Sequence, residues 1–230
     1  MARPRKLHDE YFKRAKADGY LARSAYKLIE INDRKGLIRP GDRVLDLGCA
    51  PGSWVQVAAD LVGPRGAVVG IDLLGCSPLL AESVGGNVRC LVGDVFTVDP
   101  SDLLRAGPGG AAGFDVVLSD MAPNTSGHGD DLLSARLCRR VLEVLPALLR
   151  PGGHLAMKIF EGAEYPALVE QARGLFREAR GFKPKASREV SRETYILGTS
   201  YRPPDDAREA APRRPGIAPS PPTPPAGWGA

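Results

Sequence analysis

Short apolar segments with polar ends recur along most of this 230-residue chain and limit it to few folds. Each is rich in β-branched or other apolar residues and is bounded by glycine or proline, which is typical of strands. Helix-like patterns lie between them, and near-continuous apolar strands indicate a parallel sheet that is covered on both faces. The five segments are RVLDLG (43–48), AVVGID (67–72), VRCLVGD (88–94), FDVVLSD (114–120) and HLAMKIF (154–160).

The remaining patterns complete an α/β, Rossmann-like fold. A final strand, ETYILGTSY (193–201), follows without a strong intervening helix, so it predicts an antiparallel hairpin with a strand near 177–183. The expected architecture is a mostly parallel seven-stranded sheet with one antiparallel strand and helices on both faces. Apolar periodicity places the intervening helices at 54–61, about 78–84, 132–149 and 165–176.

Two further helices precede the sheet, one over 9–17 and one starting near Ser24, a residue type that favours the N-cap. Apolar residues at Ala25, Leu28 and Ile29 give the second helix one buried stripe. Lys27 lies off that stripe, so the pattern by itself predicts an exposed lysine.

The domain organisation follows from these patterns. Residues 1–40 are expected to form basic helices packed on the core, and 41–201 the main α/β domain. Residues 202–230 contain nine prolines and few apolar residues, so they are expected to be a disordered tail.

The net charge of +4 is too small to identify a partner, but its distribution is informative. Residues 1–40 hold eleven Lys or Arg against five Asp or Glu. With a second basic cluster, they could form a nucleic-acid footprint if the fold brings the two together. Otherwise they are two solvated faces. The second cluster is Arg180, Lys183, Lys185, Arg188 and Arg192.

The cysteines and the hydropathy exclude several classes of protein. The four cysteines form no CxxC pair and the three histidines are scattered, so neither a structural zinc site nor a disulfide framework is expected. No apolar stretch approaches the roughly 18 residues that a membrane span needs. A soluble, cytoplasmic protein with reduced thiols is therefore predicted, without a membrane partner.

The polar strand ends predict a ligand site. In open α/β sheets, ligands bind beyond the carboxyl ends of the strands, near the point where the strand order reverses. Gly48 and Gly52 in DLGCAPGSW allow a ligand to approach the backbone closely. An acid at the end of the second strand can accept hydrogen bonds from ribose hydroxyls. The polar ends of strands two to five are Asp72, Asp94, Asp120 and Lys158.

An adenosine-containing cofactor fits these ends. The loop lacks the GxGxxG pattern of dinucleotide-binding proteins. S-adenosylmethionine has ribose and adenine but no phosphates, so it needs no phosphate cradle. The pattern supports an adenosine-containing cofactor at 48–94 and leaves open whether that cofactor carries methionine or nicotinamide.

Seven motifs carry a resemblance to the FtsJ-type ribose 2′-O-methyltransferases, and within them to the ribosomal RNA large subunit methyltransferase E family. They spread over about residues 8 to 201. One departure is Ser53, where the family commonly has a second glycine. The motifs are SAYKL (24–28), VLDLGCAPGSW (44–54), GIDLL (70–74), GDVF (93–96), SDMAPNTSG (119–127), MKIFEG (157–162) and SREVSRETYI (187–196).

The resemblance implies a methyltransferase that acts on a ribose 2′-hydroxyl, expected on a uridine of 23S ribosomal RNA within the large subunit. It also implies a catalytic set of two lysines and two acids. Cofactor contacts are carried over in the same way. The catalytic residues are Lys27, Asp120, Lys158 and Glu193, and the cofactor-binding residues are Gly52, Trp54, Asp72, Asp94 and Asp120.

The reaction explains why such a set is needed. A 2′-hydroxyl is a poor nucleophile until its proton is lost or shared, so Lys158 is expected to act as the base or to stabilise the alkoxide. Lys27 and Glu193 would position the ribose. SDMAPN offers one acid and lacks the aromatic residue with which base-methylating enzymes hold a flipped base, so oxygen is the expected acceptor and no metal is expected.

Other readings stay open at this stage. Transfer RNA or a messenger cap could be the substrate, although the short chain leaves no room for a cap-binding domain. A non-catalytic RNA-binding assembly factor could use the same fold. We expect a monomer.

Overall fold

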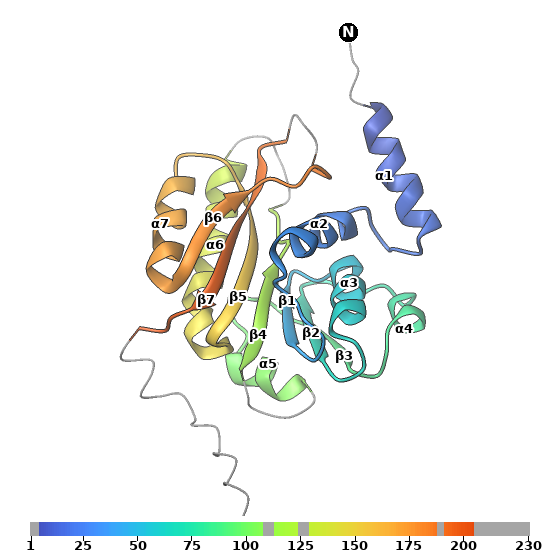
Figure 1. The fold of residues 1–230 in the computed structure, drawn as a ribbon, viewed down its shortest axis with the longest axis horizontal. Helices are drawn as coiled ribbons and strands as arrows, with labels where there is room; N and C mark the ends of the chain where they lie inside the picture. The colour runs from blue at the N-terminus through green and yellow to red at the C-terminus, as the bar shows by residue number, and fades with distance from the viewer. Residues whose placement is uncertain (1–4, 108–112, 124–128, 188–190, 205–230) are drawn as a thin grey trace, which may run out of the picture.

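The computed structural model describes residues 5–107, 113–123, 129–187 and 191–204. Seven strands form one sheet in the order β3-β2-β1-β4-β5-β7-β6 (Figure 1). The predicted seven-stranded, mostly parallel sheet is therefore confirmed. The strands are β1 (Arg43–Leu47), β2 (Ala67–Asp72), β3 (Val88–Val92), β4 (Phe114–Ser119), β5 (Leu149–Phe160), β6 (Phe176–Phe182) and β7 (Glu193–Tyr201).

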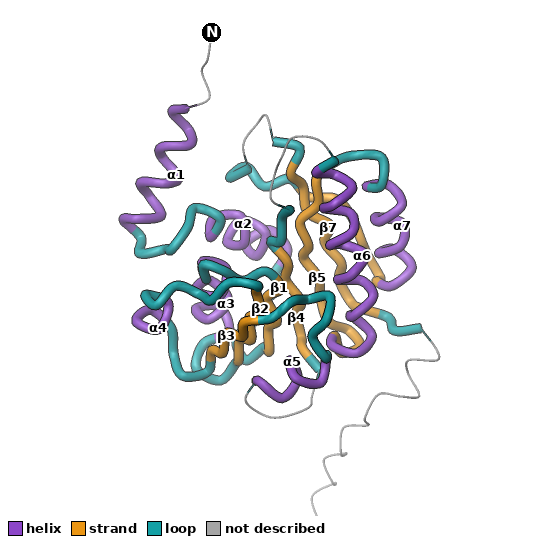
Figure 2. Tube along the Cα trace, turned by 180° about the vertical axis from the view of Figure 1, so that it is seen from behind, coloured by secondary structure: helices purple, strands orange, loops and turns teal. Residues whose placement is uncertain are grey.

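Helices cover both faces of the sheet and divide the core into two large clusters. One face packs against α2 and α3, and the other against α5, α6 and α7, which Figure 2 shows from behind. These apolar layers explain why the central strands β1, β2 and β4 consist mostly of buried apolar residues. The helices are α1 (Arg5–Ala17), α2 (Ala25–Lys35), α3 (Ser53–Val62), α4 (Leu80–Ser83), α5 (Pro100–Ala106), α6 (Asp130–Leu148) and α7 (Tyr165–Leu175).

The register brings the strand ends to one edge. Leu47 at the end of β1 pairs with Ile71 in β2 and with Ser119 in β4, and Ser119 pairs with Met157 in β5. Parallel strands in this register place the residues that follow them side by side. Asp72 at the end of β2, Asp120 directly after β4 and the loop between β1 and α3, called the cofactor loop below, therefore share one edge of the sheet.

The antiparallel strand β7 brings a distant segment to that edge. β7 pairs with β5 in the opposite direction, with Tyr195 opposite Lys158 and Glu193 opposite Phe160. The beginning of β7 thus meets the end of β5, although the two are far apart in sequence.

The N-terminal helices differ in how they contact the core. Helix α2 contributes Leu28 and Ile31 to the cluster beneath it, while α1 stands to one side (Figure 1). Helix α1 is held by a small cluster in which Ala15 packs with Tyr26 and Ala186. The predicted tail from 205 onward lies outside the described residues.

Three details differ from the sequence expectations. Ser24 precedes α2, but its side chain makes no capping bond and instead hydrogen-bonds to Ser53 (Oγ to Oγ, 2.8 Å). Helix α5 was not predicted, although the Asp99 carboxylate accepts a bond from the Ser101 amide (2.8 Å) in an N-cap that precedes proline. Strand β5 begins earlier, at Leu149, with an irregular register opposite β4 between Phe114 and Val116.

Within the described ranges, no helix is both long enough and apolar enough to cross a membrane.

Candidate active site

The loop between β1 and α3 passes close to the end of β4. Gly48 has a φ of +82°, and a Cβ added there would lie 2.3 Å from Cγ of Met121. Gly52, with a φ of +118°, immediately precedes α3. Other residues rarely adopt these conformations, so the two glycines predicted from sequence are required for the path of this loop.

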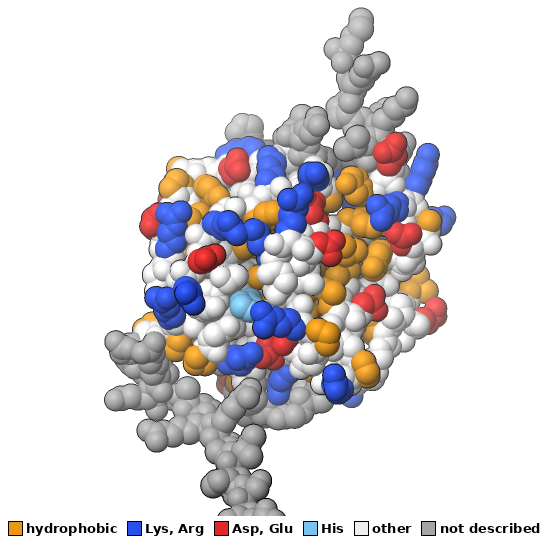
Figure 3. Space-filling model, viewed as in Figure 1, with side chains coloured by type: hydrophobic (Ala, Val, Ile, Leu, Met, Phe, Trp, Pro, Cys, Tyr) orange, Lys and Arg blue, Asp and Glu red, His pale blue; other side chains and the backbone are white. Residues whose placement is uncertain are grey.

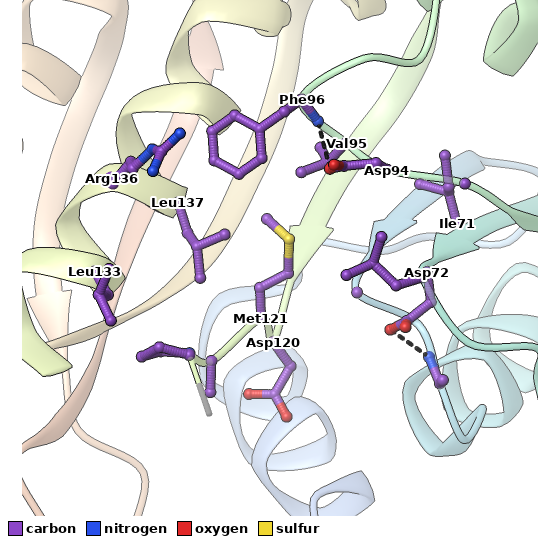
Figure 4. Close-up of a pocket in the computed structure, with 16 residues that line it drawn as sticks. Ile71, Asp72, Asp94, Val95, Phe96, Asp120, Met121, Leu133, Arg136 and Leu137 are labelled. Carbon is purple, nitrogen blue, oxygen red and sulfur yellow. Dashed lines mark hydrogen bonds between the residues drawn. The ribbon is translucent and has the colours of Figure 1, made fainter. Parts of the chain in front are cut away.

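Asp72 and Asp94 are fixed by backbone amides. The Asp72 carboxylate accepts bonds from the Ala50 amide (3.1 Å) and from the Leu74 amide (2.9 Å). The Asp94 carboxylate accepts a bond from the Phe96 amide (2.9 Å), and Figure 4 shows both acids at the rim of one cavity. Because the donors are backbone groups, each acid is held in place and keeps lone pairs for a ligand.

A cavity of about 570 Å³ opens between these acids and α6 (Figure 4). Apolar side chains line much of it, and the Arg136 guanidinium lies 4.9 Å from the centroid of the Phe96 ring. Its size is that of ordinary small-molecule sites. The lining residues with side chains beyond Cβ are Ile71, Asp72, Leu73, Asp94, Val95, Phe96, Asp120, Met121, Pro123, Leu133, Arg136 and Leu137.

The polar and apolar groups that line the cavity fit S-adenosylmethionine. Three carboxylates, Asp72, Asp94 and Asp120, line it. Carboxylates accept hydrogen bonds from ribose hydroxyls and attract a sulfonium and an ammonium group. The apolar wall offers a surface for a purine ring, so the ribose, the sulfonium, the ammonium and the adenine would each face a suitable group.

Two predicted cofactor contacts lie elsewhere. Gly52 and Trp54 are not among the described residues that line this cavity. Trp54 is buried, donates its indole N–H to the Ser24 carbonyl (2.9 Å) and stacks on Tyr195 at 5.7 Å between centroids. A direct contact of either residue with the cofactor stays a prediction, and their visible role is to shape the loop and the start of α3.

Lys158 is buried and paired. Its ammonium lies 3.1 Å from Oδ1 of Asp120 and also donates to the backbone carbonyl of that residue. Only 7% of its side chain is exposed, and β5 continues to Phe160. Lys158 is therefore not a strand end that reaches solvent.

Lys27 and Glu193 form a second buried pair. The Lys27 ammonium lies 2.6 Å from Oε1 of Glu193, with 8% and 12% of the two side chains exposed. Ser187 donates its hydroxyl to the same oxygen (2.9 Å). The apolar stripe of α2 predicted an exposed Lys27, and that prediction is wrong because β7 brings a carboxylate to this face of the helix.

Tyr195 was missed by the sequence reasoning. Its hydroxyl donates to Oδ1 of Asp120 (2.6 Å), the same oxygen that faces Lys158. Burial, followed by the neighbouring Asp120 and Glu193 charges, raises the Tyr195 pKa well above its ordinary value. The Tyr195 phenol therefore stays protonated at neutral pH and remains a hydrogen-bond donor. The available signal was its place two residues after Glu193, on the same face of β7.

The four residues predicted to be catalytic thus come from α2, the end of β4, β5 and β7, and meet as two buried ion pairs. Asp120 belongs to both parts of the site, since it lines the cavity and binds Lys158. Fixed charges in a partly dry cleft interact strongly with a group that becomes charged during a reaction. The arrangement is suited to stabilising an oxyanion next to the cofactor cavity.

The structure also brings the two basic segments together. The backbone amide of Lys185 donates to the Glu30 carboxylate on α2 (2.7 Å), and Ala186 packs against Ala15 and Tyr26. Figure 3 shows Lys and Arg side chains gathered over α2 and the β6–β7 edge. Of the predicted cluster, Arg188 lies outside the described residues. The two basic segments therefore lie next to each other beside the site, with acidic side chains such as Glu30 among them.

Comparisons with known proteins agree with this geometry. Residues 20–201 match the sequence model of the FtsJ-like methyltransferases. A relative from Syntrophobacter fumaroxidans, a ribosomal RNA large subunit methyltransferase E, is 47% identical over 198 residues, which cover 85% of this chain and 97% of that protein.

Solved structures share the fold. A ribosomal RNA methyltransferase from Plasmodium falciparum superposes with a TM-score of 0.67 at 25% identity, over 79% of this chain and 98% of that one. Fibrillarin from Aeropyrum pernix, solved with bound S-adenosyl-L-methionine, has a TM-score of 0.54 at 22% identity, over 76% of each chain. The second likeness concerns the fold alone.

Proposed function

The chain belongs to the FtsJ-like methyltransferase family, and from this premise we propose that it methylates the ribose 2′-hydroxyl of a uridine in 23S ribosomal RNA of the large subunit. The observation that carries the proposal is the pairing of Lys158 with Asp120, at the point where Asp120 also lines the cofactor cavity. The relatives named as large-subunit ribosomal RNA methyltransferases support the substrate class.

S-adenosylmethionine, when bound, supplies an activated methyl group. Asp72 would hold the ribose hydroxyls and Asp94 the adenine end, since both carboxylates are fixed at the rim of the cavity. Gly52 and Trp54 would maintain the loop that closes over the methionine end. Asp120 would face the reacting part, because it lies between the cavity and Lys158.

Lys158 would stabilise the 2′-oxygen as it becomes an alkoxide. Its ammonium donates a hydrogen bond to the Asp120 backbone carbonyl and lies 3.1 Å from Oδ1 of the same residue, which restricts its orientation. As an ammonium, Lys158 would donate to the 2′-oxygen while the 2′-proton passes to solvent; as a neutral amine, it would itself accept that proton, and its pairing with Asp120 holds the nitrogen in place for either role. Preorganised donors of this kind contribute to catalysis because they need no reorientation during the reaction.

Lys27 and Glu193 would position the ribose next to Lys158. Their side chains pair with each other, so neither is free to rotate away. A ribose that is held in the right position and orientation reacts faster, because the entropy cost of aligning it has already been met on binding.

The basic surface over α2 and the β6–β7 edge would hold phosphates of the RNA. Electrostatic contacts with phosphates give affinity and orientation without sequence preference. The choice of one uridine would then depend on the shape of the ribosomal substrate.

Replacing Lys158 tests the proposal directly. Lys158→Ala is expected to lower methyl transfer by about 10²- to 10⁴-fold, with the S-adenosylmethionine affinity within about 2-fold of the parent, since the lysine does not line the cavity. Tritiated methyl transfer and calorimetry measure the two quantities. Arg65→Ala, an exposed cation in the loop before β2, is the control. Full turnover by Lys158→Ala would reject the assigned role.

The substrate is tested by offering large subunits, naked 23S RNA and transfer RNA from cells that lack the gene. Incorporation mapped to one uridine 2′-oxygen of the large-subunit RNA is expected. Methylation of transfer RNA alone would contradict the proposed substrate, and binding without any methyl transfer would indicate an assembly factor.

A further inference from the structure

Three of the four cysteines meet at one point of the fold. Sγ of Cys49 lies 3.5 Å from Sγ of Cys76, and Sγ of Cys76 lies 2.9 Å from Sγ of Cys90. All three sulfur atoms are within 4.8 Å of one another. The sequence predicted no zinc site because it contains no CxxC pair, but the fold assembles the three thiols from separate segments.

The backbone holds each thiol in place. The Cys49 amide donates to the carbonyl of Ile71 in β2 (3.2 Å). The loop that carries Cys76 is fixed by the Ser77 amide, which donates to the Pro51 carbonyl (2.9 Å). Cys90 lies within β3, in the ladder with β2. The thiols are therefore preorganised rather than gathered from mobile chain.

Gly70 makes room for the cluster. A Cβ added to Gly70 in β2 would lie 2.7 Å from Sγ of Cys49. Gly70 also pairs with Cys90 in the register of the sheet, so the Cys49 thiol lies over β2 on the side of its neighbour in β3. Any larger side chain at position 70 would displace Cys49 from the cluster.

We propose that Cys49, Cys76 and Cys90 bind one thiophilic metal ion, with Zn²⁺ as the expected occupant and solvent completing its coordination.

The chemistry of three thiolates determines the class of ion. Zn–S bonds of about 2.3 Å in a tetrahedral site place sulfur atoms about 3.8 Å apart, so small shifts of these side chains suffice. Thiolates select Zn²⁺ and Cu⁺ over Mg²⁺ and Ca²⁺, which prefer oxygen. Cys90 is exposed, so an ion and a water molecule can reach the cluster.

A buried acid beside the cluster adds a second reason to expect a cation. Asp46 in β1 pairs with Gly70 in the sheet register, so it shares a row with Cys90. Its carboxylate is fully buried, and neither oxygen has a hydrogen-bond partner among the described residues. Burial raises the Asp46 pKa, and the Asp120 and Cys76 charges add to the shift. A divalent cation held by the thiolates would offset their charge and would favour the ionised form of this acid.

The cluster is separate from the cofactor cavity. None of the three cysteines is among the described residues that line the cavity. They belong to the cofactor loop, the segment after β2 and the strand β3, so one ion would tie these three segments together. Its role would be structural, as a clip that holds the cofactor loop to the sheet.

Cobalt binding tests the site. The full chain is reduced, freed of metal with a chelator under anaerobic conditions and titrated with Co²⁺, which reports thiolate ligands by near-ultraviolet charge-transfer absorption. One equivalent per chain is expected to produce this band, and Zn²⁺ is expected to displace it. Zn²⁺ should also raise the thermal midpoint of the parent.

Single substitutions assign the ligands. Cys76→Ser and Cys90→Ser are expected to lose the band and to weaken Zn²⁺ binding by more than about 100-fold, since losing a ligand costs more than losing a group that only orients one. Cys138→Ser is the matched control, because this buried thiol donates to the Lys158 carbonyl (3.1 Å) far from the cluster. Circular dichroism shows that each variant is folded.

Two results of the metal titrations would overturn the proposal, and a third would come from the isolated protein. One is a parent protein that is folded and fully reduced but gives no charge-transfer band. The other is Zn²⁺ binding that Cys76→Ser and Cys90→Ser leave unchanged. A Cys76–Cys90 disulfide found in protein isolated under alkylating conditions would also reject it, in favour of a redox pair.

Discussion

The ion-pair cluster and the cofactor cavity share one edge of the sheet but hold their charged groups differently. In the cluster, Lys27 and Lys158 are each buried against a carboxylate. In the cavity, Asp72 and Asp94 accept backbone amides and remain accessible. Under the proposed function, the two lysines that face a developing negative charge are each held by a carboxylate. The two acids that bind and release the cofactor are held by neutral backbone amides.

Asp120 joins the two regions, and under the proposed function it would direct both of them to the same reacting atoms. One carboxylate oxygen accepts from Tyr195 and faces Lys158, while the residue also lines the cavity. The comparison predicts that substitutions in the ion-pair cluster should lower methyl transfer without changing cofactor affinity. Substitutions in the cavity should lower cofactor affinity with little change in turnover at saturating cofactor, and Asp120 is the exception to both.

After Lys158→Ala, the largest effect is expected from Glu193→Gln. It removes the charge opposite the buried Lys27 ammonium, and we expect a loss of about 2–3 kcal/mol of unfolding free energy, since the amide oxygen still accepts a bond. The midpoint temperature of thermal unfolding should fall by roughly 5–10 °C. Methyl transfer should fall by about 100-fold at unchanged cofactor affinity. Glu178→Gln, at an exposed position of β6, is the control.

A second substitution sharpens this result. Lys27→Met combined with Glu193→Gln removes the unpaired charge, so stability should recover in part while methyl transfer stays low. Recovery of both would mean that the pair has only a structural role.

Asp72→Asn should give the opposite pattern. An amide group cannot accept from both the Ala50 and Leu74 amides, so the loop loses one bond and the ribose loses an acceptor. The S-adenosylmethionine affinity should fall about 10- to 100-fold, with turnover at saturating cofactor within about 3-fold. Calorimetry and steady-state kinetics measure these, with Asp60→Asn on the exposed side of α3 as the control. Unchanged affinity would remove Asp72 from the cofactor site.

Tyr195→Phe should have a smaller effect. It removes one hydrogen bond to Asp120 but retains the stacking on Trp54. Turnover should fall by about 10-fold, since a bond to a charged group contributes about 1.5–3 kcal/mol and Lys158 still holds Asp120. The control is Tyr201→Phe, because the buried Tyr201 hydroxyl has no hydrogen-bond partner in the described part of the chain. Equal effects at both tyrosines would argue against a positioning role.

The smallest effect is expected outside both regions, at Lys16 in the last turn of α1. Lys16→Glu should weaken RNA binding a few-fold and reduce the slope of its salt dependence by about one. Stability and cofactor affinity should not change. Binding that weakens for one RNA sequence only would contradict a phosphate-contacting role, and Lys16→Gln separates loss of a positive charge from its reversal.

Residues close in sequence were predicted well. The strands carry near-continuous apolar runs because both sheet faces are covered, and this pattern placed their carboxyl ends, with Asp72, Asp94 and Asp120, within a residue or two. The glycines at 48 and 52 were identified because a tight loop after a strand needs positive φ angles. Helix α5 was overlooked because its seven residues are too few for a clear period.

Only the tertiary structure could decide which charges pair and which thiols meet. The sequence by itself determined an α/β sheet, its ligand-binding edge and, through resemblance, the four candidate catalytic residues. It could not show that Lys27 is buried against Glu193, or that Cys49, Cys76 and Cys90 converge, since these depend on strand order and register. Periodicity records which side of an element faces the core, whereas pairing across the sheet depends on neighbours that are distant in the chain.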